Sequence, residues 1–139
     1  MHSGVVLLAI REFCMFLSIN SFAYLDSLSS FTLGRLPQIP TNAITVDLPP
    51  VIKEDDEEGW EAYGIKETRK PSAKSSTFVQ VATLSKIVNS TLQMFFAPSQ
   101  MLSGTLLLNE YSKYQRWYSD LPTIIQSIDD APPHVLCLQ

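Results

Sequence analysis

YLDSLSSFTLGRLPQIPTNAITVDLPP, residues 24–50, is the stretch that decides the fold of this chain. A row of large apolar residues leads into it at steps of two or three positions: Phe22, Leu25, Leu28, Phe31 and Leu33. Steps of three place side chains on one face of an α-helix. The row therefore predicts a helix whose apolar face packs against the rest of the protein.

The same stretch also contains the signal that ends this helix. Gly34 stands where a residue in the left-handed conformation commonly terminates a helix, and Arg35 follows close to the helix-end carbonyls. Pro37 and Pro40 prevent the helix from restarting and hold the residues before them extended. We expect a proline-bounded arm over residues 36–52, attached by apolar side chains such as Ile39.

Composition limits the class of protein. With 139 residues, the chain fits one domain, and 45% hydrophobic residues are enough to form a buried core. The net charge of −4 provides no basic surface for nucleic acid. We therefore expect no direct contact with nucleic acid by these residues.

The residues that could carry chemistry are few and scattered. Cys14 and Cys137 lie at opposite ends of the chain, without the short pair spacing of a zinc site. His134 and Cys137 could share a helical face, but two ligands do not form a tetrahedral site. No phosphate loop, HExxH helix or nucleophile elbow is present. The sequence predicts no cofactor, no metal and no enzyme activity, although a small enzyme built on isolated carboxylates stays open as an alternative.

The N-terminus is apolar and requires its own interpretation. Residues 5–10 form an apolar run, and Arg11 and Glu12 separate it from the uncharged residues 13–25. The charged pair interrupts both a signal peptide and a membrane span. We predict a buried helix and no membrane partner; the alternative is a small secreted or membrane-associated helical protein.

Periodicity along the chain predicts an all-α fold, with three main helices near residues 5–33, 77–97 and 102–120 and a helix stub after Pro132. Ser76 or Thr77 is expected to cap the second helix. On the third, Leu107, Tyr111 and Tyr114 mark the expected apolar face. Glu110, Lys113 and Arg116 mark the expected solvent face. The dense charges of residues 53–76 predict a long flexible loop.

Several short segments together resemble a known family. Leu33-Gly34-Arg35-Leu36-Pro37-Gln38-Ile39-Pro40, followed by Leu48-Pro49, resembles the "LGRPxxIP…LP" segment of the fungal-specific middle regulatory domain of zinc binuclear cluster transcription factors (the xylanolytic-activator-like regulatory domain). Here the first proline comes one residue later than in the family pattern. Further matches follow in the family's order: Trp60 and Tyr63 after an acidic run, Trp117 with Leu121-Pro122, and Pro133-His134 at the start of a helix.

This resemblance implies a division of the chain and a function. The expected parts are a core helix (1–35), the proline arm (36–52), the charged loop (53–76), a helical hairpin (77–121) and a connector with a helix stub (122–139). The resemblance implies part of a regulatory domain that acts in the nucleus, in transcription regulation, through helix packing and partner contacts. Its partners would be flanking helices of the parent domain or other transcription proteins. Zinc would be bound only by the family's cysteine cluster, which is absent from this chain.

The apolar character of the first helix adds an expectation about solution behaviour. Side chains such as Val5, Phe13 and Phe22 surround most of its circumference, and two further helices cover only one side. A large exposed apolar surface promotes association. The isolated chain is therefore expected to self-associate.

Overall fold

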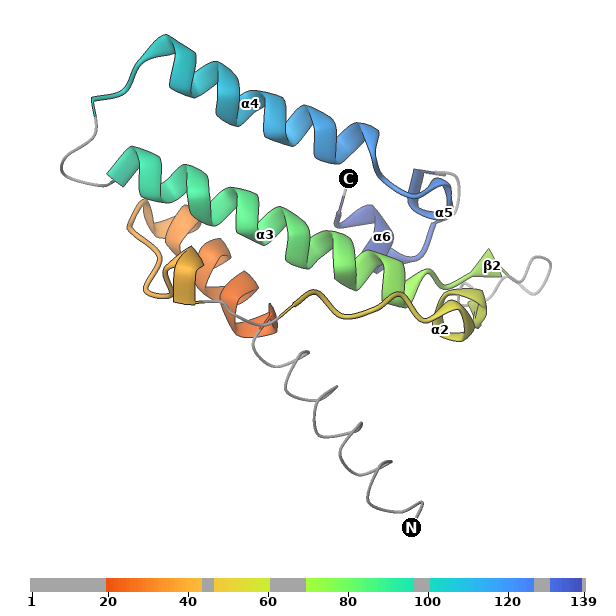
Figure 1. Cartoon of the computed structure of the whole chain (residues 1–139). Helices are drawn as coiled ribbons and strands as arrows, with labels where there is room; N and C mark the ends of the chain where they lie inside the picture. The colour runs from red at the N-terminus through yellow and green to blue at the C-terminus, as the bar shows by residue number, and fades with distance from the viewer. Residues whose placement is uncertain (1–19, 44–46, 61–69, 97–100, 127–130, 139) are drawn as a thin grey trace.

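The computed structural model describes residues 20–43, 47–60, 70–96, 101–126 and 131–138 (Figure 1). Residues 20–33 are helical, and the part of the predicted first helix before residue 20 lies outside the described residues. The remaining elements are η1 (Thr41–Ala43), α2 (Lys53–Glu57), β1 (Gly59–Trp60), β2 (Lys70–Pro71), α3 (Lys74–Phe96), α4 (Gly104–Ser119), α5 (Thr123–Gln126) and α6 (Pro133–Leu136). The predicted all-α class is confirmed; the described strands form one small antiparallel pair, β1 with β2.

The helix α3 occupies the centre of the described structure. It contacts η1, α2, α4 and α6. Figure 1 shows α4 along one side of α3 and the helix of residues 20–33 against another side. The core helix was expected within residues 1–35; among the described residues, α3 has the central position.

The start of α3 differs from the prediction because another segment caps it. The helix begins at Lys74 rather than near residue 77. The Asp56 carboxylate accepts hydrogen bonds from the Ser76 amide, at 2.8 Å, and from the Ser76 hydroxyl. A carboxylate that accepts a first-turn amide does the work of an N-cap side chain. The predicted cap at Ser76 or Thr77 is therefore wrong, and the cap comes from α2.

Residues 53–76 are not one flexible loop where the structure describes them. They contain α2, β1, β2 and the first residues of α3, while residues 61–69 lie outside the described residues. The Ser72 amide donates to the Glu58 carbonyl at 2.9 Å, and the Ser72 hydroxyl donates to the Asp55 carbonyl at 2.6 Å. These bonds attach α2 to the start of α3. The high charge density did not reveal this attachment, because the bonds use mostly backbone groups.

The inward face of the helix over residues 20–33 is the opposite of the predicted one. Its predicted apolar face is exposed: Phe22, Leu25, Leu28, Phe31 and Leu33. Its buried residues are small or polar: Asn20, Ala23, Ser27 and Ser30. On α3, Ala82, Ser85 and Asn89 are buried in turn, and the Ser27 hydroxyl donates to the Ser85 carbonyl at 3.5 Å. Small side chains let two helix backbones approach closely, and this explains why the serine side faces inward.

The interface between α3 and α4 contains a polar cluster. Thr91 donates to the Glu110 carboxylate at 3.2 Å and shares a hydrogen bond of 2.9 Å with the Tyr114 hydroxyl. Lys113 forms an ion pair with Glu110 and lies 3.4 Å from the Ser90 hydroxyl. The prediction that Glu110 and Lys113 face solvent is therefore wrong, because this cluster draws both toward α3. Two residues of the predicted apolar face, Leu107 and Tyr111, are exposed instead.

The apolar core lies near the C-terminal part of the described chain. Buried residues form one cluster: Ala73, Leu121, Ile125, Ala131, Val135 and Leu138. Partly buried side chains from α3, α4 and α5 pack against this cluster: Val81, Leu84, Trp117 and Ile124. The cluster joins the start of α3 to the end of α4, to α5 and to α6.

Candidate functional site

The first motif ends its helix as the sequence predicts. Gly34 has φ +61°, in the left-handed region. Its amide donates to the Phe31 carbonyl at 3.3 Å, and the Arg35 amide donates to the Ser30 carbonyl at 3.0 Å. This pair of bonds is the Schellman arrangement that satisfies carbonyls at a helix end. The role predicted for Gly34 is confirmed.

After the turn, the arm is fixed at Ile39 by both of its backbone groups. The Ile39 amide donates to the Asp26 carboxylate at 2.8 Å, and the Ile39 carbonyl accepts from the Asn89 side chain at 2.9 Å. Asp26 lies on the helix of residues 20–33, and Asn89 lies on α3. We call this arrangement the Ile39 anchor. It connects the helix end, the arm and α3 at one point.

The other motif residues of the arm and the charged segment differ in how deeply they are buried. Pro37 and Leu48 are half-buried, Pro49 is buried and Pro40 is exposed. Trp60 is half-buried in β1. Tyr63 lies outside the described residues, so the placement of the aromatic pair stays a prediction.

The C-terminal motif residues assemble on the apolar core. Trp117 packs against the cluster that contains Leu121. The Pro122 carbonyl accepts from the Ile125 amide at 2.9 Å and so begins the turn of α5. On α6, Pro133 occupies the start of the helix, and the Nε2 of His134 lies 2.5 Å from the Ser72 carbonyl. These motif residues lie in or against the apolar core or at the ends of α5 and α6.

Some important residues were missed because their role depends on distant partners. Asp26, Asn89 and Asp56 each hold a backbone group of another segment. Nothing in the spacing of these residues marks them, because the partners are separated by 13, 50 and 20 positions. An isolated acid or amide within a helical pattern is a weak signal for such a bond.

The described residues offer little for catalysis or metal binding. No group of three or more His, Cys, Asp or Glu side chains in this part of the chain is arranged to hold a metal ion. A largely apolar cavity of about 480 Å³ lies between the helix of residues 20–33, α3 and α6, with Tyr24, Phe78 and His134 in its lining. None of the helices described is long and apolar enough to cross a bilayer.

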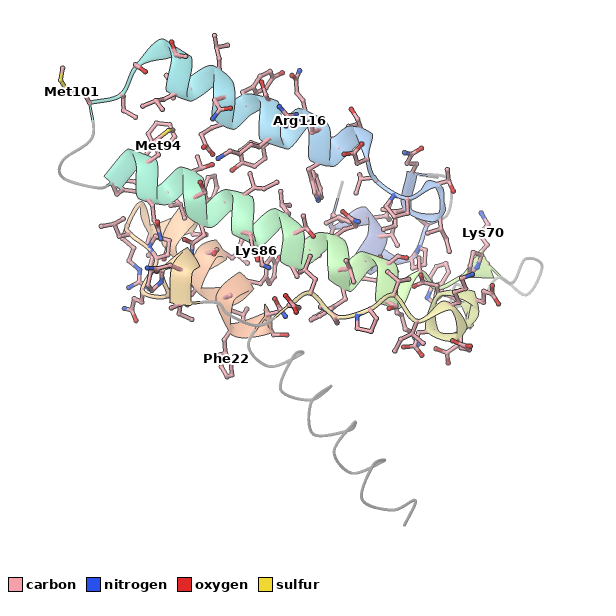
Figure 2. The ribbon with its side chains drawn as sticks, in the orientation of Figure 1. Phe22, Lys70, Lys86, Met94, Met101 and Arg116 are labelled. Carbon is pink, nitrogen blue, oxygen red and sulfur yellow. The ribbon has the colours of Figure 1, made fainter. Side chains whose placement is uncertain are left out.

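The more prominent features are two exposed apolar faces. The first, on the helix of residues 20–33, carries Phe22, Leu25, Leu28 and Phe31, and we call it the N-terminal face. Figure 2 shows Phe22 pointing away from α3. The second lies on α4 and carries Leu107, Leu108, Tyr111 and Tyr118; we call it the α4 face. Contiguous apolar surface of this kind marks sites of protein interaction.

Comparison with known proteins gives these faces a context. The family model of the fungal-specific transcription factor domain matches residues 22–125. The chain belongs to this family. The match begins in the helix before the Ile39 anchor and ends at Ile125 in the apolar core, so it includes most of the features described above.

One curated relative is the nitrogen assimilation transcription factor nit-4 of Neurospora crassa. It is 30% identical over 124 residues, and the match covers 81% of this chain but only 11% of the relative. No solved structure matches the chain. The family predicted from the sequence is thus confirmed, and the secreted or membrane-associated alternative is not favoured.

Proposed function

We propose that this chain forms part of the regulatory domain of a fungal transcription factor and acts in the nucleus through contacts with other helices and transcription proteins. The α4 face is the observation that carries this proposal. Four large side chains, Leu107, Leu108, Tyr111 and Tyr118, are exposed side by side on a helix whose other side packs on α3. Membership of the transcription factor family supports a protein partner on this face.

In this proposal the domain has no catalytic step and does not itself bind DNA. A net charge of −4 opposes approach to phosphate. DNA binding and zinc then belong to another part of the regulator. Metal analysis of the purified chain should return no stoichiometric zinc, and a mobility-shift assay should detect no DNA complex; stoichiometric zinc or a specific DNA complex would contradict the proposal.

The function is tested by tethering the chain to a heterologous DNA-binding domain and a fluorescent protein in a fungal host with a reporter gene. We expect nuclear fluorescence, and reporter output that differs from that of the DNA-binding domain alone. The double substitution Leu108→Glu and Tyr111→Glu should return the output to baseline, because two carboxylates on the α4 face prevent apolar contact.

The matched control is Asn109→Glu, which adds a carboxylate to the opposite flank of the same helix at an exposed position. It should leave reporter output unchanged. An unaltered reporter with the wild-type chain, or the same loss with Asn109→Glu, would refute the role of the α4 face.

A further inference from the structure

The N-terminal face is both apolar and free of charge. The exposed fractions of its four large side chains run from 47% for Leu28 to 68% for Phe31. Asp26 is the only Asp, Glu, Lys or Arg within residues 20–33. Its carboxylate is held by the Ile39 amide in the Ile39 anchor. A partner on this face therefore meets apolar side chains and hydroxyl groups, without a charge that must be neutralised.

The order of residues on this face is symmetric. Pairs of identical residues stand at equal distances on either side of the midpoint between positions 26 and 27: Leu25 with Leu28, and Phe22 with Phe31. At 3.6 residues per turn, the leucine pair lies near the middle of the exposed side, and the phenylalanines lie at its two edges. The pattern therefore looks the same when the helix direction is reversed.

Such a pattern is complementary to itself. When two identical helices cross in opposite directions about this midpoint, Leu25 meets Leu28 of the other copy and Phe22 meets Phe31. A two-fold interface requires one surface patch that matches itself in this manner. We propose that the N-terminal face binds a second copy of this chain, with the two helices antiparallel about a two-fold axis near residues 26 and 27.

The available area fits a modest interface. A fully buried aromatic side chain contributes about 150–250 Å², so two phenylalanines that are roughly two-thirds exposed leave about 100–150 Å² each. With the two leucines, each copy has at most about 450 Å² of these side chains to bury, so the total for both copies stays below the ~1,000 Å² at which stable specific interfaces begin. The dimer should therefore dissociate on dilution.

The first test is the mass of the full chain in sedimentation equilibrium over a range of concentrations. The mass should approach twice the 15.6 kDa of one chain at high concentration and fall to 15.6 kDa on dilution. Leu25→Asp should keep the chain monomeric, because the carboxylate would be buried against an apolar partner. Leu108→Asp makes the same change on the α4 face and should leave the dimer intact.

The second test fixes the direction of the helices. In a background with Cys14→Ser and Cys137→Ser, single variants Ser21→Cys and Thr32→Cys are treated with a short bismaleimide cross-linker. Their mixture should cross-link, because position 21 of one copy faces position 32 of the other. Each variant alone should not, since equivalent positions in an antiparallel pair lie about 16 Å apart along the helix axis.

Three outcomes would overturn the proposal. A monomeric mass at every concentration would show that the N-terminal face does not bind a second copy of the chain. Equal loss of association in Leu25→Asp and Leu108→Asp would indicate general adhesion of apolar surface. Cross-linking of the single variants would indicate a parallel pair. The reporter assay on the α4 face does not depend on these results, so the failure of one proposal can be told from the failure of the other.

Discussion

The helix of residues 20–33 and the C-terminal core bury opposite kinds of side chain. In the core, large apolar side chains such as Ile125 and Val135 are fully buried. In the helix of residues 20–33, Ala23, Ser27 and Ser30 are buried while the large side chains remain exposed. The core gains stability from apolar area removed from water, whereas the other contact buries small side chains and includes the hydrogen bond from the Ser27 hydroxyl to the Ser85 carbonyl.

This difference teaches that an apolar stripe identifies a face of a helix but not the partner of that face. The stripe on residues 20–33 is available for a partner beyond the described residues, and the serine side is used within the domain. Four substitutions test this difference, and they follow in order of the expected loss in the free energy of unfolding.

The largest effect is expected for Ile125→Ala. Ile125 is completely buried in the apolar cluster, and truncation of such a side chain leaves a cavity that costs about 2–5 kcal/mol of the free energy of unfolding. Urea denaturation monitored by circular dichroism measures this loss. The matched substitution Leu25→Ala, studied at dilution, should change the free energy by less than about 0.5 kcal/mol. Similar losses in both variants would remove the distinction between the two regions.

Enlarging the serine side should also destabilise the protein. Ser27→Leu places a large side chain where Ser27 is buried and contacts the Ser85 carbonyl. Overpacking of this kind costs about 1–3 kcal/mol. Ser29→Leu, at an exposed position of the same helix, is the control and should have little effect in thermal unfolding. If Ser27→Leu raised the melting temperature, the close helix contact would be incorrect.

Removal of the cap supplied by α2 should have a smaller effect. Asp56→Ala deletes the carboxylate that accepts the Ser76 amide, and loss of an N-cap side chain costs about 0.5–2 kcal/mol. Glu57→Ala removes the same charge at an exposed neighbouring position and should be nearly neutral. Equal urea midpoints for the two variants would mean that Asp56 affects stability only through its charge and not through its hydrogen bond to the Ser76 amide.

The smallest effect is expected for Gly34→Ala. No atom lies within 4 Å of an added Cβ, so the cost comes from the left-handed backbone alone, with φ +61°. This cost is about 1–2 kcal/mol, and about 0.4–1 kcal/mol of it is offset because alanine restricts the unfolded chain more than glycine does. Gly104→Ala, at a position with ordinary backbone angles and open space, should be neutral or slightly stabilising. Differential scanning calorimetry compares the pair. A neutral Gly34→Ala would indicate that the helix end relaxes without strain.

Much of the fold follows from local sequence. The end of the first helix at Gly34 and the hairpin of α3 and α4 depend on residues a few positions apart, so they were predictable. The α4 cap is local too: the Ser103 hydroxyl accepts from the Leu106 amide at 3.2 Å.

The errors share a physical cause. The inward faces of residues 20–33 and of α4 depend on buried polar contacts. A hydroxyl or carboxylate can be buried only where a partner satisfies its hydrogen bonds, and that partner is not visible in the local sequence. Glu110 looks solvent-exposed in the sequence because its partner Thr91 lies 19 positions away on α3. Of the motif residues named from the sequence, Gly34 lies at the helix end, and Trp117 and Leu121 lie in or against the apolar core. An exposed apolar surface that includes Phe22 was expected on the first helix, and Phe22 is exposed. The α4 face was not expected, because its exposure is a property of the assembled helices.

The Ile39 anchor has a consequence for the order of events during folding. Its bond to Asp26 closes a loop of 13 positions, and its bond to Asn89 closes one of 50. The longer closure costs about 1.2 kcal/mol more in chain entropy. We therefore expect the bend from the helix into the arm to form first, as a local unit, and α3 to dock onto it afterwards. In stopped-flow experiments Asn89→Ala should then accelerate unfolding and leave the refolding rate almost unchanged.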